Sequence, residues 1–465
     1  MDLSYTTASE QRLLLDKGEI TSVELTKSTL ERIDRFNPAV NAVVVLRAEG
    51  ALADAARADA VPIGDRGPLH GVPALVKDAT ETVDMPTSYG CKALEGFESG
   101  YDAVAIERMR RAGMIIVGKT NTPEFGLRPT TENQVFGTTR NPWDHARTSG
   151  GSSGGAAAAL ALGMVALAQG SDGGGSCRIP ASCCGVVGMK PSRGRVPWAP
   201  VSYELWAGLA TNGPMARTVA DTALLYAAMA GPVVGEPYGV YQSAPRAAGV
   251  VPVVGVCTTP PHGTVDHRII EAVNDTARAL EREGWHVEEL DLDLTGLYDP
   301  FMTVLEGNTA AAVDALIGDR GLDVLEANML ALALRGKSKS AGDYAAAVSA
   351  MRSRSAAVMI ASERFDFVLT PTLTAVPHRL DDYPRLQTHE GRWQEYLDWL
   401  AFTYPFNCTG QPAISVPGTP SQDGLPIGVQ LVGRMGDDAG VLEAAAVVER
   451  IRPWNTRYAE RFAAA

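Results

Sequence analysis

The chain has 465 residues, of which 45% are hydrophobic and 20% charged, so it is globular and can bury a large core. It carries 41 lysines and arginines against 54 aspartates and glutamates, a net charge of −13. That balance argues against a nucleic-acid binder, which needs a basic surface, and against a protein held on anionic lipid. We therefore expect neither a nucleic-acid nor a membrane partner.

The first 60 residues are predicted to be mainly helical. Thr21 and Ser22 precede an apolar run of helical period, as is typical of a helix N-cap. A short strand is predicted at 41–46 and a further helix at 49–60. The N-terminus shows neither the basic nor the apolar region of a signal peptide, so we expect a cytoplasmic protein.

From residue 70 onward, short apolar runs alternate with helices, the rhythm of an α/β protein. Residues 148–171 contain no charge, but glycines interrupt them, which favours a buried helix and strand over a membrane span. Further helices are predicted at 103–111, 218–230, 265–283, 300–315, 322–335, 341–363 and 439–450. Further strands are predicted at 72–76, 114–117, 253–256, 367–369, 413–416 and 427–432.

The cysteines and histidines of the sequence predict neither disulfide bonds nor a metal site. Six cysteines are too few for a disulfide framework in a chain of this length, so we expect reduced thiols packed as small apolar residues. None of the seven histidines has metal-ligand spacing. We therefore expect no metal and no other cofactor.

One short motif suggests nucleotide binding but lacks the context for it. Residues 113–120, GMIIVGKT, satisfy the P-loop pattern G-x-x-x-x-G-K-[ST]. A P-loop needs a flexible loop after a strand, whereas the four intervening residues here form the predicted strand itself. We therefore interpret Lys119 as a structural lysine at a strand end.

A second motif matches the nucleophile elbow of α/β-hydrolases. Residues 150–155, GGSSGG, contain G-x-S-x-G in two registers. An elbow requires a strand directly before the serine, but residues 141–149 are predicted to be a polar loop, and no downstream histidine has a recognisable setting. A serine esterase that uses Ser152 is therefore kept only as an alternative.

A third interpretation joins three distant segments. Lys77 follows the apolar run 71–76; alone it would be interpreted as a paired structural lysine, but a lysine withdrawn from water has a lowered pKa and can serve as a neutral base. The 150–155 loop supplies hydroxyl groups on small residues. Residues 170–178, GSDGGGSCR, place Ser176 after three glycines, whose amides can form an anion-holding concavity. Ser176 is then a candidate nucleophile in its own oxyanion hole.

Taken together, these motifs resemble the amidase signature family. Residues 150–196 carry most of the resemblance, and matching segments occur at 70–78, 118–124, 139–143, 213–221 and 406–415. The resemblance implies one α/β domain over residues 1–465, with a twisted mixed sheet of about 10 strands covered by helices on both faces. Within that domain we expect an N-terminal helical segment (1–68), the signature core (69–220) and a remainder that includes the pocket loops (221–465).

The resemblance also implies roles for individual residues. Ser176 matches the family's nucleophile, Ser152 its bridging serine, held by a cis peptide bond, and Lys77 its general base. The proton of Ser176 would pass through Ser152 to Lys77, with no metal in the reaction. The oxyanion hole is matched by the amides of Gly173, Gly174, Gly175 and Ser176, and its supporting network by Ser153, Asp172 and Arg178.

Two positions depart from the family pattern. Gly173 stands where Thr, Ile or Ala is common, which predicts a looser loop or a wider pocket. Cys177 stands where an aliphatic residue is common, and the sequence gives it no function.

The implied activity is hydrolysis of an amide, ester or carbamate through an acyl-enzyme, and the chain resembles aryl acylamidases, nylon-oligomer hydrolases and urethanases. An alternative is the amidase component of a tRNA-dependent amidotransferase complex, in which Gln usually follows the arginine of the nucleophile loop; here Ile179 follows Arg178. A small molecule is the expected partner, and a homodimer is left open. The residues expected to line an apolar pocket are Tyr89, Trp143, Tyr203, Trp206 and Phe406.

Overall fold

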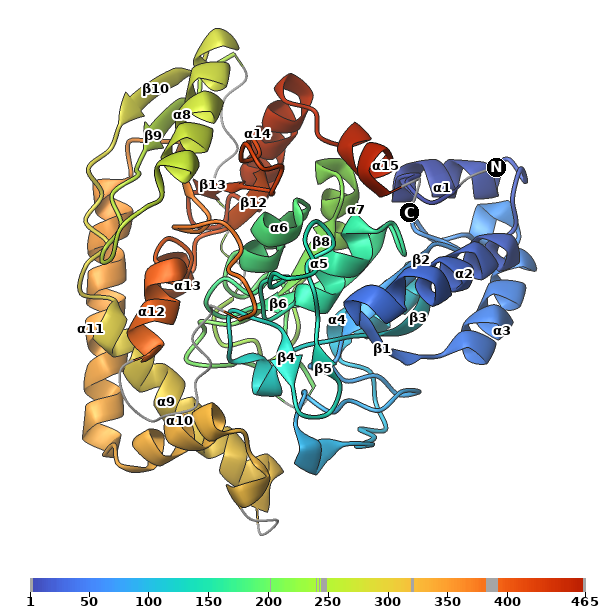
Figure 1. Cartoon of the computed structure of the whole chain (residues 1–465), viewed down its shortest axis with the longest axis horizontal. Coiled ribbons are helices and arrows are strands. Elements are labelled where there is room, and N and C mark those ends of the chain that lie inside the picture. Colours follow the sequence, from blue (N-terminus) through green and yellow to red (C-terminus); the bar gives the residue numbers. More distant parts are fainter. Residues whose placement is uncertain are drawn as a thin grey trace.

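An extended mixed β-sheet runs through the centre of the molecule, with helices on both sides of it (Figure 1). The computed structural model describes residues 3–200, 202–239, 241, 243, 249–318, 322–381 and 392–462. Within these residues eleven strands form the sheet, in the spatial order β1-β3-β2-β6-β8-β7-β12-β13-β11-β9-β10. A separate two-stranded sheet pairs β4 with β5.

The strands are short, and most of them lie between two others. They are β1 (Val43–Leu46), β2 (Pro73–Lys77), β3 (Ile115–Thr120), β4 (Glu132–Asn133), β5 (Gly137–Thr138), β6 (Leu167–Asp172), β7 (Val187–Lys190), β8 (Thr211–Ala216), β9 (Val253–Val256), β10 (His286–Glu289), β11 (Phe367–Pro371), β12 (Ala413–Pro417) and β13 (Gly428–Gly433). The pairs β2–β3, β2–β6, β9–β10 and β9–β11 are parallel, and the other neighbours are antiparallel.

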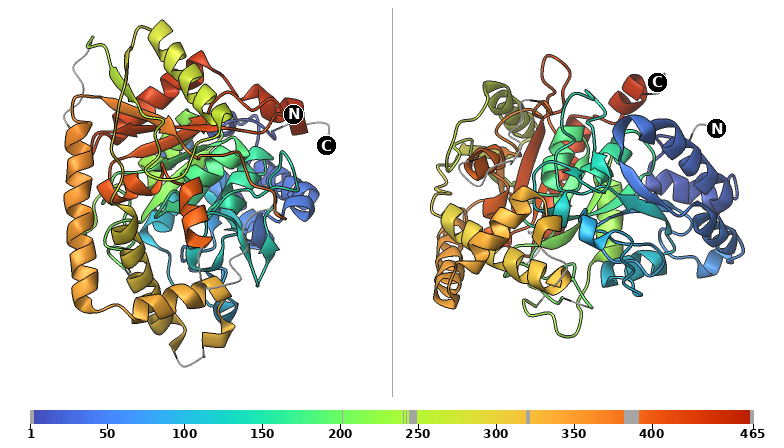
Figure 2. Two further views of the ribbon diagram at one scale, coloured as in Figure 1. Left: turned by 60° about the vertical axis from the view of Figure 1, so that its left-hand side comes forward. Right: turned by 60° about the horizontal axis from the view of Figure 1, so that its bottom comes forward.

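The helices of the described residues cover the sheet and extend beyond one of its ends. They are α1 (Ala8–Asp16), α2 (Ser22–Val40), α3 (Ala48–Asp59), α4 (Val104–Arg111), α5 (Gly154–Ala161), α6 (Arg178–Cys184), α7 (Val219–Met229), α8 (His267–Arg282), α9 (Tyr298–Leu316), α10 (Ala327–Lys337), α11 (Ala341–Ala361), α12 (Arg392–Trp399), α13 (Tyr404–Thr409), α14 (Asp438–Ile451) and α15 (Thr456–Phe462). Figure 2 shows α9, α10 and α11 gathered along one side of the molecule.

The two faces of the sheet carry different helices. On one face α5 and α6 pack against each other, and on the other α4, α7 and α14 pack in a row. Strand β13 separates them: a Cβ added at Gly428 would meet Ser182 of α6, whereas one added at Gly433 would meet Val441 of α14. Helix α5 consists of small and apolar residues, all of them buried. It lies close to the sheet, because a Cβ on Gly155 would come within 2.4 Å of the Asn121 amide nitrogen.

The sheet topology brings the candidate site together at one edge. Strands β2 and β6 are parallel neighbours, with Val76 opposite Gln169, so their C-terminal ends lie side by side. Lys77 is the last residue of β2 and Asp172 the last of β6. Ser153 and Cys177 directly precede α5 and α6, so both helices begin beside the same edge.

The predicted α/β class is confirmed, with eleven strands in place of about ten. The predicted N-cap at Thr21 is confirmed, since its hydroxyl accepts from the Glu24 amide in a capping box. The helix predicted at 322–335 is wrong in part, because the described residues contain a short 3₁₀ turn at Leu322–Val324, and α10 begins only after Glu326. Nine helices and strands of the described residues were not predicted: β4, β5, β7, β8, β10, α6, α12, α13 and α15.

Two further expectations concern the cysteines and the uncharged stretch. All six cysteines are buried free thiols, as predicted. The uncharged stretch folds into α5 and β6, also as predicted. Among the described residues, every helix falls short of the length and apolar character that crossing a bilayer requires.

Candidate active site

Lys77 is a fully buried lysine whose amine reaches two hydroxyl groups. Its Nζ donates to Ser152 Oγ at 2.6 Å and to Ser171 Oγ at 2.9 Å. The side chain is 0% exposed. Burial lowers the pKa of Lys77 to about 8, although the neighbouring Cys177 and Asp172 favour the charged form. A large fraction of this amine is therefore neutral near pH 8 and able to accept a proton.

Ser152 lies in a tight loop that only glycines allow. The Gly151–Ser152 peptide bond is cis. A Cβ on Gly151 would fall 2.5 Å from the Thr130 carbonyl oxygen, so this loop runs directly against backbone. The Ser153 amide donates to the Ser176 carbonyl at 3.1 Å, which joins this loop to the one that carries Ser176.

Ser176 ends the glycine-rich loop, and its half-buried side chain faces a cavity. Within the described residues its Oγ makes no hydrogen bond, to Ser152 or to any other group. The amides of Gly173, Gly174 and Ser176 likewise have no acceptor in the described part of the chain. The Gly175 amide differs, because it donates to Asp172 Oδ1 at 2.8 Å. Three of the four predicted oxyanion donors thus have no acceptor among the described residues, whereas the Gly175 amide is already engaged, which corrects the expectation for Gly175.

Asp172 and Arg178 form a buried ion pair behind this loop. Arg178 donates from Nε to Asp172 Oδ2 at 2.9 Å and from Nη2 to Oδ1 at 2.8 Å, and both side chains are 0% exposed. Burial alone would raise the pKa of Asp172, but the Arg178 guanidinium and the Asn407 amide lower it to about 2. The carboxylate is therefore charged at any working pH and holds the loop through Gly175.

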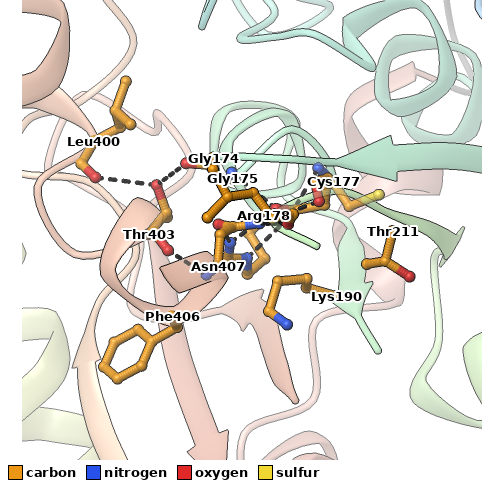
Figure 3. Close-up of polar contacts among 12 residues, drawn as sticks. Gly174, Gly175, Cys177, Arg178, Lys190, Thr211, Leu400, Thr403, Phe406 and Asn407 are labelled. Atoms are coloured by element: carbon orange, nitrogen blue, oxygen red, sulfur yellow. Dashed lines mark hydrogen bonds and ion pairs between the residues drawn. The ribbon is translucent and has the colours of Figure 1, made fainter. Parts of the chain in front are cut away.

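Residues from the C-terminal third complete the network, as Figure 3 shows around Arg178. Arg178 also donates to Asn407 Oδ1 at 2.6 Å and to Gln430 Oε1 at 2.7 Å. Thr403 Oγ1 donates to the Gly174 carbonyl at 2.7 Å and so holds the glycine loop from its other side. The loop is thereby fixed by Asp172 at the end of β6 and by Thr403 directly before α13, while Asn407 and Gln430 hold the Asp172–Arg178 pair.

Two cavities meet at Ser176. One of about 120 Å³ is lined by Ser152, Ser171 and aromatic side chains that include Tyr89 and Trp206. The other, of about 50 Å³, is mainly aliphatic and aromatic. Four residues line both cavities: Gly126, Leu127, Ser176 and Trp206.

Two of the five aromatic residues expected in the pocket, Tyr89 and Trp206, line the larger cavity. The structure places the other three elsewhere, which corrects that expectation. Trp143 packs on Phe462, and its Nε1 donates to the Cys184 carbonyl. Phe406 is 1% exposed in the core and is turned away from the polar network in Figure 3. Tyr203 is 41% exposed on a surface loop.

The two rejected motifs have structural roles. Lys119 lies in β3 and donates to the Thr80 carbonyl and to Thr87 Oγ1, as expected for a structural lysine. The residues before Ser152 form a loop rather than the strand that a nucleophile elbow needs. The hydrogen bond of Ser152 Oγ is to a lysine, whereas an elbow serine pairs with a histidine.

Sequence reasoning missed Ser171, Thr403, Asn407 and Gln430. Ser171 was expected within a buried strand, but its contact with Lys77 depends on how β6 pairs with β2. Asn407 falls inside the 406–415 segment that carried part of the resemblance, so the sequence held a signal there. For Thr403 and Gln430 the sequence offers no signal.

Comparisons with known proteins place this sequence and fold among amidases. Residues 24–442 match the model of the Amidase family. An acylamidase of Rhodococcus erythropolis is 32% identical over 470 residues, which cover 97% of each protein. One component of the glutamyl-tRNA(Gln) amidotransferase of Roseiflexus castenholzii is 34% identical over 502 residues, covering 98% of this chain and 97% of that protein. A solved structure of 6-aminohexanoate cyclic dimer hydrolase complexed with substrate has a TM-score of 0.92, with 32% identity and 99% coverage of both chains.

Proposed function

The chain belongs to the Amidase family and hydrolyses amides, and from this premise we propose that Ser176, Ser152 and Lys77 cleave the bond through an acyl-enzyme. The proposed substrates are small amides, aryl amides and carbamates (urethanes), with esters as a further class. All of these carbonyls pass through a similar tetrahedral intermediate. The hydrogen bond between the amine of Lys77 and Ser152, 2.6 Å long and fully buried, is the observation that carries the proposal.

The proposed reaction begins with neutral Lys77. The amine accepts the Ser152 proton as Ser152 accepts that of Ser176, whose Oγ attacks the carbonyl carbon. The developing oxyanion is bound by the amides of Gly173, Gly174 and Ser176. The proton returns through Ser152 to the leaving nitrogen or oxygen, the C–N or C–O bond breaks, and water activated by the same residues then cleaves the acyl-enzyme.

The hydrogen bond between Ser152 and Ser176 has to form during this reaction. Hydrogen bonds between catalytic groups are often long in the free enzyme and shorten when substrate binds. Ser176 Oγ has no competing partner among the described residues, and Ser152 is already held by Lys77. The proposal requires that the Ser176 hydroxyl turns toward Ser152 when substrate binds.

The test is a matched panel of a 4-nitroanilide, a 4-nitrophenyl ester and an aryl carbamate. Wild type should cleave at least one of them, and Ser176→Ala, Ser152→Ala and Lys77→Met should each lose about 10²-fold or more in kcat. Lys119→Met is the matched control, because burial lowers the pKa of Lys119 to about 8 as well, yet its amine binds only structural groups. Loss of activity in Lys119→Met as large as in Lys77→Met would contradict the assignment.

The main alternatives predict different results from the same panel. A component of a tRNA-dependent amidotransferase, to which the chain is also similar, would act only within its complex, so hydrolysis by the purified chain argues against it. An esterase that uses Ser152 as nucleophile would keep its rate in Ser176→Ala. We further propose a cytoplasmic location, supported by six free buried thiols, which are typical of a reducing compartment.

A further inference from the structure

Trp206 occupies the space beside the glycine loop that a side chain at position 173 would need. A Cβ added to Gly173 would lie 2.4 Å from Trp206 Cζ3 and 2.7 Å from Cε3. Real Cβ atoms essentially never come so close to ring carbons, so the indole can take this position only because residue 173 is glycine. The departure from the family pattern therefore does not widen the pocket, because an aromatic ring from another loop fills the space.

The loop that carries Trp206 is held in an unusual backbone conformation. Trp206 and Ala207 both have positive φ angles, 58° and 52°, which non-glycine residues adopt rarely. Arg193 Nε donates to the Gly208 carbonyl at 2.6 Å, and Arg352 Nη2 donates to the Ala207 carbonyl at 2.5 Å. Two arginines thus fix the loop, which indicates that the indole is a preset wall of the site.

Both cavities beside Ser176 are bounded by this indole and lack an available charge. The described lining of the larger cavity contains no charged side chain. The smaller one contains Arg128, whose Nη1 and Nη2 are paired with Glu132 and Glu326, while its buried Nε has no partner among the described residues. A substrate carboxylate there would gain at most one hydrogen bond, from a guanidinium already faced by two carboxylates, and in either cavity an ionised group would lose its hydration.

We propose that Trp206 is a specificity-determining residue, which divides the space around Ser176 into two apolar compartments and so selects uncharged amides with a ring-sized amine and a short acyl group. This inference rests on the proposed function. The leaving group belongs in the larger compartment, because that compartment contains Ser152, which returns the proton to the leaving nitrogen. Its volume of about 120 Å³ approaches the roughly 150 Å³ of a cavity that holds benzene.

The acyl group then lies in the smaller compartment of about 50 Å³. Its walls include Ile179, Phe301, Leu305 and Leu400, which suit a short alkyl chain. A chain of several methylenes, or one ending in a carboxylate, would not fit without displacing a wall. An anilide of a short neutral acid is therefore the preferred substrate class.

The first test uses coupling between Gly173 and Trp206, measured with acetyl 4-nitroanilide. Gly173→Ala should lower kcat by about 10-fold or more, because the added methyl group collides with the indole and displaces an oxyanion donor. In the double variant, Trp206→Ala should restore most of the kcat that Gly173→Ala loses. Trp198→Ala is the matched control, since Trp198 lines the same cavity but contributes none of the three atoms nearest to a Cβ at position 173, and it should restore nothing.

The second test measures selectivity and needs no change at Gly173. Wild type should prefer acetyl to octanoyl and to succinyl 4-nitroanilide by about 10-fold or more in kcat/KM. Trp206→Phe and Trp206→Ala should progressively relax the preference against a larger naphthylamide, with folding checked by thermal melting.

Three results would overturn the inference: full activity of Gly173→Ala, a loss that Trp198→Ala relieves equally well, or unchanged selectivity in both Trp206 variants. In each case Ser176→Ala should still be inactive, so the proposed function would stand. A wild type that cleaves no member of the panel would instead overturn the proposed function, and this inference with it.

Discussion

Replacing Asp172 by asparagine tests the buried support of the glycine loop. The Asp172 carboxylate accepts five hydrogen bonds, from the amides of Gly175 and Cys177, twice from Arg178 and once from Asn407. All four partner residues donate, so the NH₂ group of an asparagine would face donors, and the Arg178 guanidinium would be left buried without a counter-charge. Breaking a buried ion pair in this way costs about 3–5 kcal/mol.

The pKa of Asp172 gives a second value for the free energy that its charge contributes to folding. The Arg178 guanidinium holds this pKa at about 2, against its ordinary 3.8. Because the folded-state pKa is lowered, the charged form stabilises the fold above pH 3.8, and that contribution is lost as pH falls toward 2. It amounts to about 2.5 kcal/mol at 1.36 kcal/mol per pKa unit. The substitution should cost more than protonation does, since it also places a donor against donors.

Denaturant unfolding at pH 7 measures the cost directly, and Asp221→Asn provides the control. Asp221 is equally buried, but burial raises its pKa, and its hydrogen bonds come from Ala8 and Ser9 rather than from a guanidinium. We expect Asp172→Asn to lower the free energy of unfolding by about 3–5 kcal/mol and to abolish nearly all activity. Asp221→Asn should lower the free energy of unfolding clearly less. Equal losses in the two variants, or an Asp172→Asn protein with wild-type stability, would refute the reasoning.

Three further predictions concern the catalytic groups. The kcat/KM of wild type should fall about tenfold per pH unit below pH 8, because burial lowers the pKa of Lys77 to about 8 and only the neutral amine accepts a proton; a rate that stays flat down to pH 5 would contradict this. Ser171→Ala removes a hydroxyl that accepts from the charged amine, so the acid limb of the same profile should move to lower pH; a shift to higher pH would count against the assigned contact. Thr403→Val removes the hydrogen bond to the Gly174 carbonyl, so it should lower the free energy of unfolding by about 1 kcal/mol in denaturant unfolding. The same variant should lower kcat more than it raises KM. An effect on KM alone would argue against a role of Thr403 in holding the loop.

The sequence predicted the fold class and most of the peripheral elements because those segments carry strong local signals. The strand β8 shows where such signals fail. Its residues Thr211–Ala216 include Asn-Gly-Pro, which favours a turn, yet they pair with β6 on one side and β7 on the other. Pairing within the sheet outweighs the local preference there, and a single sequence does not reveal which strands meet.

The same limit applies to the site. Lys77, Ser152 and Ser176 were singled out by their motifs, and their roles came from the resemblance to the amidase signature family rather than from the residues alone. Thr403 and Gln430 are ordinary residues in distant segments, and only the fold brings them to the glycine loop. Trp206 was expected in the pocket, but its contact with Gly173 could not be predicted, because that contact depends on a loop conformation with positive φ angles.

The central claim is that Ser176 forms the acyl-enzyme, and trapping that intermediate tests it most directly. The purified chain would be mixed with a slowly hydrolysed 4-nitrophenyl carbamate, and the modified residue located by peptide mass spectrometry. We predict one carbamoyl group per chain on Ser176, a burst of 4-nitrophenol of equal amount, and neither in Ser176→Ala. A carbamoyl group on Ser152, or turnover by Ser176→Ala at the wild-type rate, would contradict the account.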